Sequence, residues 1–77
     1  MEIVPGFYRH YKGKMYRVLG VALHSETQEE LVVYQAQYDS EFGTRALWVR
    51  PKAMFLEEVE IEGKKVPRFK LMERRKF

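Results

Sequence analysis

The residue types that could do chemistry gather at His24-Ser25-Glu26, and a second histidine, His10, lies elsewhere in the chain. These are the residue types of a hydrolytic triad. Neighbouring residues of an extended chain point to opposite faces, however, whereas a triad needs three side chains that converge across the fold beside an oxyanion site. The chain also lacks a Gly-x-Ser-x-Gly turn. We therefore interpret Ser25 as a turn or cap residue and predict no catalytic residue.

The two histidines also raise the question of a metal. His10 and His24 could lie on neighbouring strands with Glu26 close behind, but two histidines and one carboxylate without a sequence-local pair form a weak zinc pattern. The five glycines are spread singly, so no glycine-rich loop is available to hold a phosphate. We expect no metal, no cofactor and no enzymatic activity. A small-ligand or enzymatic domain built on His10, His24, Glu26 and Arg50 is kept as the least favoured alternative.

Composition indicates one small folded domain. The chain has 77 residues, of which 45% are hydrophobic and 14% aromatic, which is enough for a single core. It has no cysteine, so disulfides and thiolate chemistry are excluded, and a reducing cytoplasm is the expected location. Residues 1–6 carry neither a basic leader nor an apolar segment, and no run reaches the roughly 18 apolar residues of a membrane span. We expect no membrane partner.

The net positive charge of the chain comes from its C-terminal end. There are 14 Lys and Arg against 11 Asp and Glu, and the excess of three is Arg74-Arg75-Lys76. We therefore divide the chain into a domain at residues 1–73 and a basic C-terminal tip at residues 74–77. Because the domain itself is balanced, its charge gives little support to nucleic-acid binding.

Alternation with a period of two residues dominates the sequence, which indicates β-strands. We expect the longest strand to bend or bulge at Gly20, where no side chain resists a bend. The polar residues 25–30 and 39–45 are expected to be loops, and a turn is expected at Glu62-Gly63-Lys64. The predicted strands are Phe7 to Tyr11, Met15 to His24, Leu31 to Tyr38, Ala46 to Arg50, Val59 to Ile61 and Val66 to Leu71.

Pro51 ends the fourth of these strands, because its ring fixes φ and removes a hydrogen-bond donor. We expect a single 3₁₀ turn across Lys52-Ala53-Met54, with Met54 and Phe55 packed into the core. Five or six short strands with one late helical turn are typical of an SH3-like barrel. The predicted fold class is therefore all-β, a small SH3-like barrel.

A distinctive set of segments spans residues 6–69, nearly the whole chain. The segments are Tyr8-Arg9-His10-Tyr11-Lys12-Gly13, Val18-Leu19-Gly20-Val21-Ala22, His24-Ser25-Glu26-Thr27, Val32-Val33-Tyr34, Trp48-Val49-Arg50-Pro51, Met54-Phe55 and Val66-Pro67-Arg68-Phe69. In these segments the chain resembles a bacterial family of short proteins known as domain of unknown function 1653. The resemblance implies a compact stand-alone domain with no agreed activity.

The candidate binding surface consists of aromatic and basic residues, which stack on flat groups or form forked hydrogen bonds. The same aromatic residues are also the obvious fillers of a small core. The predicted binding residues are Tyr8, Arg9, His10, Tyr11, Lys12, Tyr34, Trp48 and Arg50, to which His24 and Glu26 are added.

Strand parity makes the position of Trp48 decisive. If Leu47 and Val49 face the core, then Trp48 and Arg50 face outward together. If Trp48 faces the core instead, Arg50 goes inward with it and must find a carboxylate. The sequence leaves both arrangements open.

Two binding functions stand ahead of the enzymatic alternative. The first is a protein- or peptide-binding module, with Tyr8, Tyr11, Trp48 and Pro51 forming an aromatic groove. The second is binding of single-stranded nucleic acid such as RNA, in which the same aromatic rings stack on bases while Arg9, Lys12, Arg17 and Arg50 meet phosphates. The balanced charge of the domain favours the first.

Overall fold

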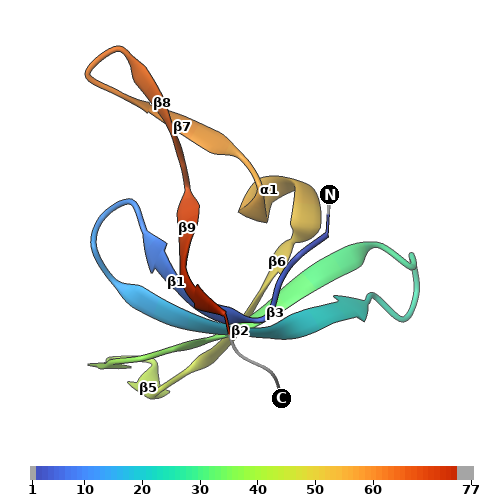
Figure 1. Ribbon diagram of the computed structural model, residues 1–77. Coiled ribbons are helices and arrows are strands. Elements are labelled where there is room, and N and C mark those ends of the chain that lie inside the picture. Colours follow the sequence, from blue (N-terminus) through green and yellow to red (C-terminus); the bar gives the residue numbers. More distant parts are fainter. Residues whose placement is uncertain (1, 75–77) are drawn as a thin grey trace.

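The computed structural model describes residues 2–74 and confirms the all-β class (Figure 1). Its centre is one antiparallel sheet of five strands, accompanied by two small two-stranded ribbons. In chain order the elements are β1 (Gly6–His10), β2 (Met15–Leu23), β3 (Glu30–Ala36), β4 (Asp39–Ser40), β5 (Gly43–Thr44), β6 (Leu47–Pro51), α1 (Lys52–Phe55), β7 (Glu58–Ile61), β8 (Lys64–Pro67) and β9 (Phe69–Arg74).

The strands of the main sheet follow the order β6, β3, β2, β1, β9. Every neighbouring pair is antiparallel. The sheet does not close on itself: within residues 2–74, β6 and β9 are its two edges and do not pair with each other. The structure therefore has a curved open sheet in place of the barrel predicted from the sequence. The chain between β6 and β9 forms α1 and the β7–β8 ribbon and does not provide a closing strand.

Most of the predicted strands match the structure, but residues 39–45, predicted to be a loop, contain the short paired strands β4 and β5. The β2–β3 register shifts between Val18 and Gly20, so the bulge expected at Gly20 is confirmed. The run from Val66 to Leu71, predicted as one strand, is instead divided at Arg68 between β8 and β9. The Arg68 N–H donates to the carbonyl of Glu57, while the Arg68 carbonyl accepts from Tyr11, so this residue leaves one ribbon and enters the main sheet.

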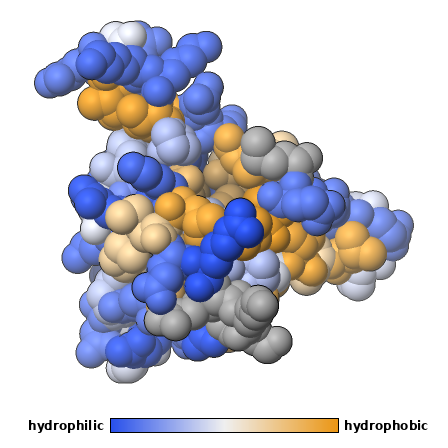
Figure 2. Space-filling view, viewed as in Figure 1, coloured by the Kyte–Doolittle hydropathy of each residue, from blue (hydrophilic) through white to orange (hydrophobic). Residues whose placement is uncertain are grey.

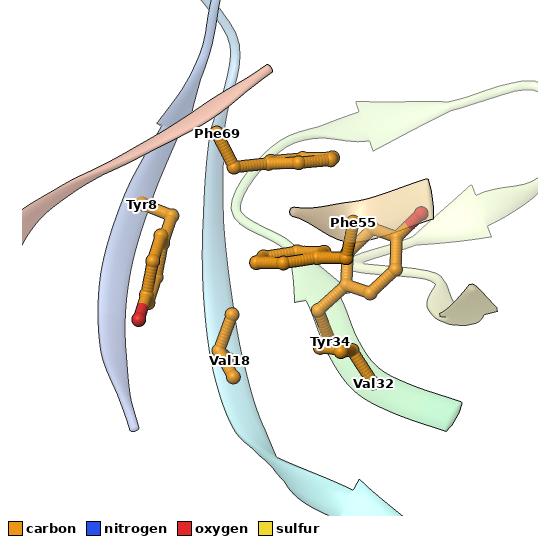
Figure 3. Close-up of a cluster of buried hydrophobic side chains, with 6 residues drawn as sticks. All are labelled: Tyr8, Val18, Val32, Tyr34, Phe55 and Phe69. Carbon is orange, nitrogen blue, oxygen red and sulfur yellow. The ribbon is translucent and has the colours of Figure 1, made fainter. Parts of the chain in front are cut away.

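The core lies on the concave face of the sheet and is rich in aromatic rings (Figure 3). Val18 and Val32 belong to this core and are completely buried. Phe55 stacks on Phe69, with ring centroids 4.2 Å apart and planes 5° from parallel. The buried cluster consists of Tyr8, Val18, Val32, Tyr34, Phe55 and Phe69.

Helix α1 begins directly after Pro51, as predicted, but it is a turn of α-helix and not of 3₁₀-helix. The Leu56 N–H donates to the carbonyl of Lys52, which is the α-helical spacing. The turn delivers only one of the two predicted residues to the core: Phe55 is 2% exposed, whereas Met54 is 47% exposed. Adjacent residues on a helix are about 100° apart, so a single short turn cannot bury both.

Gly6 permits a close backbone approach between β1 and β9. A Cβ atom at this position would lie 2.3 Å from the backbone oxygen of Glu73 on the neighbouring strand β9. The φ of Gly6 is also positive, at 155°. Only glycine allows β1 and β9 to pair at this separation.

The β7–β8 ribbon projects away from the main sheet (Figure 1). Ile61 pairs with Lys64, and both residues between them have positive φ, 51° at Glu62 and 80° at Gly63. Two positive φ values are the mark of a type I′ turn, whose twist matches that of paired strands. The turn predicted at Glu62-Gly63-Lys64 is thus confirmed.

The helical structure among residues 2–74 includes no segment with the length and apolar character needed to cross a membrane.

Candidate binding surfaces

The register of β3 and β6 decides where Trp48 and Arg50 lie. Trp48 pairs with Tyr34, and Arg50 pairs with Val32. Because both β3 partners are buried in the core, Trp48 and Arg50 occupy the concave face of the sheet. They line a cavity of about 240 Å³, which we call the aromatic pocket; its lining residues are Tyr16, Tyr34, Tyr38, Ser40, Phe42, Trp48 and Arg50.

Trp48 is on the core face without being a core residue. It lies on the edge strand β6 and is 36% exposed. The indole packs edge-to-face on Phe42 from the loop between β4 and β5, with ring centroids 5.2 Å apart. The outward arrangement considered from the sequence is wrong, yet Trp48 remains accessible to a ligand.

Arg50 goes inward with Trp48, but the carboxylate expected there is absent. Within residues 2–74, no hydrogen bond or ion pair engages its guanidinium. Its carbon Cζ lies 5.5 Å from the centroid of the Phe69 ring instead. A cation over an aromatic face is attracted by about 0.5–1 kcal/mol, far less than the cost of removing an ion from water. Arg50 is thus half-buried beside neutral rings with its charge uncompensated.

Two tyrosine hydroxyls meet at the wall of the aromatic pocket. The hydroxyls of Tyr16 and Tyr38 are joined by a hydrogen bond. Burial, followed by this hydrogen bond, raises the pKa of Tyr16 above its ordinary value. Tyr16 is therefore neutral at physiological pH, and Arg50 supplies the only charge in the lining of the pocket.

A second, larger concavity of about 490 Å³ lies between the outer side of β1 and β9 and the projecting ribbon. We call it the outer groove. Figure 2 shows apolar surface on the ribbon just below its hydrophilic tip. Arg9 and Lys70 are register partners and stand on the face of the sheet opposite the core. The groove is lined by Arg9, His10, Tyr11, Ile61, Val66, Pro67, Lys70 and Met72.

His10 lies between the core and the outer groove. Its ring contacts Phe69 and Tyr11, at centroid distances of 5.0 and 4.5 Å. Its Nδ1 accepts a hydrogen bond from the Lys12 N–H at 3.2 Å, so the proton of the neutral ring is on Nε2. Burial first, and then the cations Arg50, Arg68 and Lys12, lower the pKa of His10.

Not every predicted binding residue reaches these surfaces. Tyr8 is 7% exposed, and its hydroxyl donates to the Val4 carbonyl at 2.6 Å. The aromatic groove predicted from Tyr8, Tyr11, Trp48 and Pro51 is therefore not formed. Lys12 stands in the β1–β2 turn with its Nζ 5.8 Å from the centroid of the Tyr11 ring.

His24 and Glu26 lie at the opposite end of β2 from His10. The nine residues of β2 separate them, and a strand rises about 3.3 Å per residue. The His24 Nδ1 accepts hydrogen bonds from the backbone N–H groups of Glu26 and Thr27, at 3.2 and 3.4 Å, and Ser25 donates to the Glu26 carboxylate. His10, His24, Glu26 and Arg50 therefore do not lie together in one site. Residues 24–27 form a turn in which the His24 side chain caps backbone N–H groups. Within residues 2–74, no three His, Asp or Glu side chains gather as metal ligands.

Several lining residues were not identified from the sequence. Tyr16 and Tyr38 could have been suspected, because they share the parity of buried neighbours on β2 and β3. Phe42 and Ile61 carry no such signal, since they lie in or beside turns whose direction is set by the tertiary structure. The residues missed are Tyr16, Tyr38, Ser40 and Phe42 in the aromatic pocket and Ile61, Val66, Pro67, Lys70 and Met72 in the outer groove.

The fold and its two concavities define a small antiparallel β domain with a concave aromatic pocket and a separate basic and apolar groove. The chain belongs to the family described as protein of unknown function (DUF1653), which it matches over residues 6–71. It is similar to a protein of that family from Bordetella bronchiseptica whose crystal structure is known, with a TM-score of 0.84 and 35% sequence identity. The similarity covers 96% of this chain and 92% of the other. No curated protein matches the sequence.

Proposed function

We propose that the protein is a non-enzymatic binding module that takes an extended segment of another polypeptide in the outer groove. One observation carries the proposal: four apolar side chains line the groove together with Arg9 and Lys70, and no carboxylate does. Apolar surface in a concavity favours a partner side chain, and two cations without acids favour a partner that brings negative charge.

The size and position of the groove support a peptide. Its volume of about 490 Å³ is within the range of cavities that bind ligands. Lys70 and Met72 belong to β9, whose second side pairs with no strand among residues 2–74. An exposed strand edge offers backbone hydrogen bonds to an added extended chain, while neighbouring pockets select its side chains. The expected partner segment is therefore extended and has acidic residues next to apolar ones.

Single-stranded RNA is the competing partner, and the arrangement of the aromatic rings makes it the weaker proposal. Stacking proteins present successive rings along one track. Here Tyr11 lines the outer groove, Trp48 lines the aromatic pocket on the other face, and Tyr8 is buried. The proposed place of action is the cytoplasm, on the ground that the sequence has no cysteine.

The test is a selection of displayed random peptides on the immobilised protein, followed by amide-resonance titration of the isotope-labelled protein with the enriched peptides. We expect acidic and apolar peptides that shift Arg9, Tyr11, Ile61 and Met72. Ile61→Asp should abolish their binding, whereas Leu23→Asp, which alters a still more exposed aliphatic residue at the end of β2, should not. The same titration with short RNA at low and moderate salt tests the alternative, because phosphate contacts weaken steeply with salt.

The proposal is wrong if no peptide is enriched. It is also wrong if the enriched peptides bind the Ile61→Asp variant as well as they bind the unaltered protein.

A further inference from the structure

The aromatic pocket has a surplus of hydrogen-bond donors and no negative charge. Arg50 has five N–H donors and no hydrogen-bond partner within residues 2–74. Tyr16 and Tyr38 have two hydroxyl hydrogens between them, and their mutual hydrogen bond uses one, so one O–H is left to donate. The indole N–H of Trp48 is a further donor in the lining. A ligand that satisfies these groups must be rich in acceptors.

The charge of the pocket sets the sign of the ligand. Neither Asp nor Glu lines the cavity, and the Arg50 guanidinium lies over the Phe69 ring. A half-buried guanidinium without a counter-charge is unfavourable, and a bound carboxylate or phosphate would supply forked hydrogen bonds as well as neutralise it. The ligand is therefore expected to be an oxyanion.

The walls of the pocket set the shape of the ligand. Five of the seven lining side chains are aromatic, and Trp48 and Phe42 form the exposed side where a ligand would enter. Aromatic walls favour flat rings through stacking and edge-to-face contacts. A volume of about 240 Å³ is below the usual range for a drug-sized ligand, so one ring with a small anionic group is the upper limit.

From these three features we propose that the aromatic pocket is a binding site for a small planar ring compound carrying a carboxylate or phosphate, with Arg50 binding the oxyanion and Trp48 contacting the ring. The site is independent of the outer groove, which lies on the other face of the sheet and shares no lining residue with it. The oxyanion chemistry is common to aromatic carboxylates and aromatic phosphates, and the test separates them.

Trp48 is the sole tryptophan of the chain and lines the pocket, so its fluorescence reports occupancy directly. The unaltered full chain is titrated with 4-hydroxybenzoate and, separately, with phenyl phosphate. Phenol is the uncharged counterpart of both, and inorganic phosphate is the anion without a ring. We expect saturable quenching by at least one of the two ring anions, tighter than by its uncharged counterpart and tighter than by phosphate. Which ring anion binds identifies the source.

Two variants connect the signal to the pocket. Arg50→Met should weaken binding of the ring anion about tenfold or more, as expected for loss of a charged hydrogen bond. The matched control is Arg45→Gln, because the Arg45 guanidinium is exposed and bonds the Gln37 side chain outside the pocket. Circular dichroism of each variant verifies that it is folded.

The proposal is overturned if neither ring anion gives a saturable change at millimolar concentration. It is also overturned if phosphate or phenol binds as tightly as the ring anions, or if Arg50→Met binds as well as the unaltered chain. Should Arg50→Met fail to fold, Tyr38→Phe replaces it, with the same expected direction and the same contradicting result.

Discussion

The guanidinium carbon of Arg50 lies 5.5 Å from the centroid of Phe69, a ring that itself stacks on Phe55 at 4.2 Å. A charge from the edge strand β6 therefore rests on the outer ring of the hydrophobic core. This contact joins the part of the molecule that stabilises the fold to the part that we propose binds a ligand.

The stability of the fold should depend little on Arg50. Its charge has no acid to pair with among residues 2–74, so Arg50→Met exchanges a weak cation–ring attraction for apolar packing. We expect a change in unfolding free energy of no more than about 1 kcal/mol, measured by urea denaturation. Arg68→Met is the comparison, because it removes an ion pair with the half-exposed Glu57 at 3.2 Å and should cost about 0.2–1 kcal/mol. A large loss at Arg50 alone would show that its contacts with the rings stabilise the core.

Helix α1 should contribute to stability through one residue. Phe55→Ala removes a buried ring that contacts Tyr8, Tyr34 and Phe69, and we expect a loss of about 3–5 kcal/mol. Met54→Ala alters the preceding residue of the same turn, which is exposed, and should cost less than about 1 kcal/mol. Thermal unfolding followed by circular dichroism measures both. Equal losses would mean that α1 packs differently in solution.

Alanine substitutions at Gly6 and Gly20 should distinguish the stability cost of a steric clash from that of backbone strain. Their φ values are nearly the same, 155° and 159°, but a Cβ atom meets the Glu73 backbone oxygen at 2.3 Å only at Gly6. Both alanine variants bear the conformational strain, of about 1–3 kcal/mol, and Gly6→Ala must also push β9 away from β1. We expect Gly6→Ala to be clearly less stable in urea denaturation. Variants of equal stability would contradict the close approach of the two strands.

Acid should destabilise the fold through His10. Burial and nearby cations lower the pKa of this histidine in the folded protein, so the unfolded chain binds more protons near its ordinary value of about 6.5. Stability is therefore full above about pH 6.5 and falls as the pH drops towards the lowered value of the folded state.

The measurement for His10 is urea denaturation at about pH 7.5 and about pH 5. His10→Gln should reduce the loss between the two pH values. If His10→Gln loses as much stability between the two pH values as the unaltered protein does, the acid sensitivity comes from other groups.

Trp48 should matter less to folding than a core aromatic. Its indole is partly exposed and has an edge-to-face contact with Phe42, a kind of pair that contributes about 0.5–1.5 kcal/mol beyond area burial. Trp48→Ala should therefore keep the fold and lose well under the cost of Phe55→Ala. Collapse of the fold would make Trp48 a core residue and remove it from the proposed ligand contacts.

Much of the fold could be predicted because alternation is a local property. Val32, Tyr34 and Ala36 are all buried and lie two residues apart, so the alternation in β3 identifies its core face even when its partner strands are unknown. The bulge at Gly20 and the turn at Glu62-Gly63 likewise follow from the backbone freedom of glycine. The chain by itself thus determined an all-β domain and the position of most of its strands.

The sites were decided by tertiary structure. Whether Trp48 and Arg50 face inward depends on the β3–β6 register, and a shift of one residue would reverse both. Residues far apart in the chain, such as Tyr11 and Ile61, line one groove only because Arg68 redirects the chain between β8 and β9. Register and chain direction arise from long-range pairing, which no local pattern encodes, so the two concavities could not be read from the sequence alone.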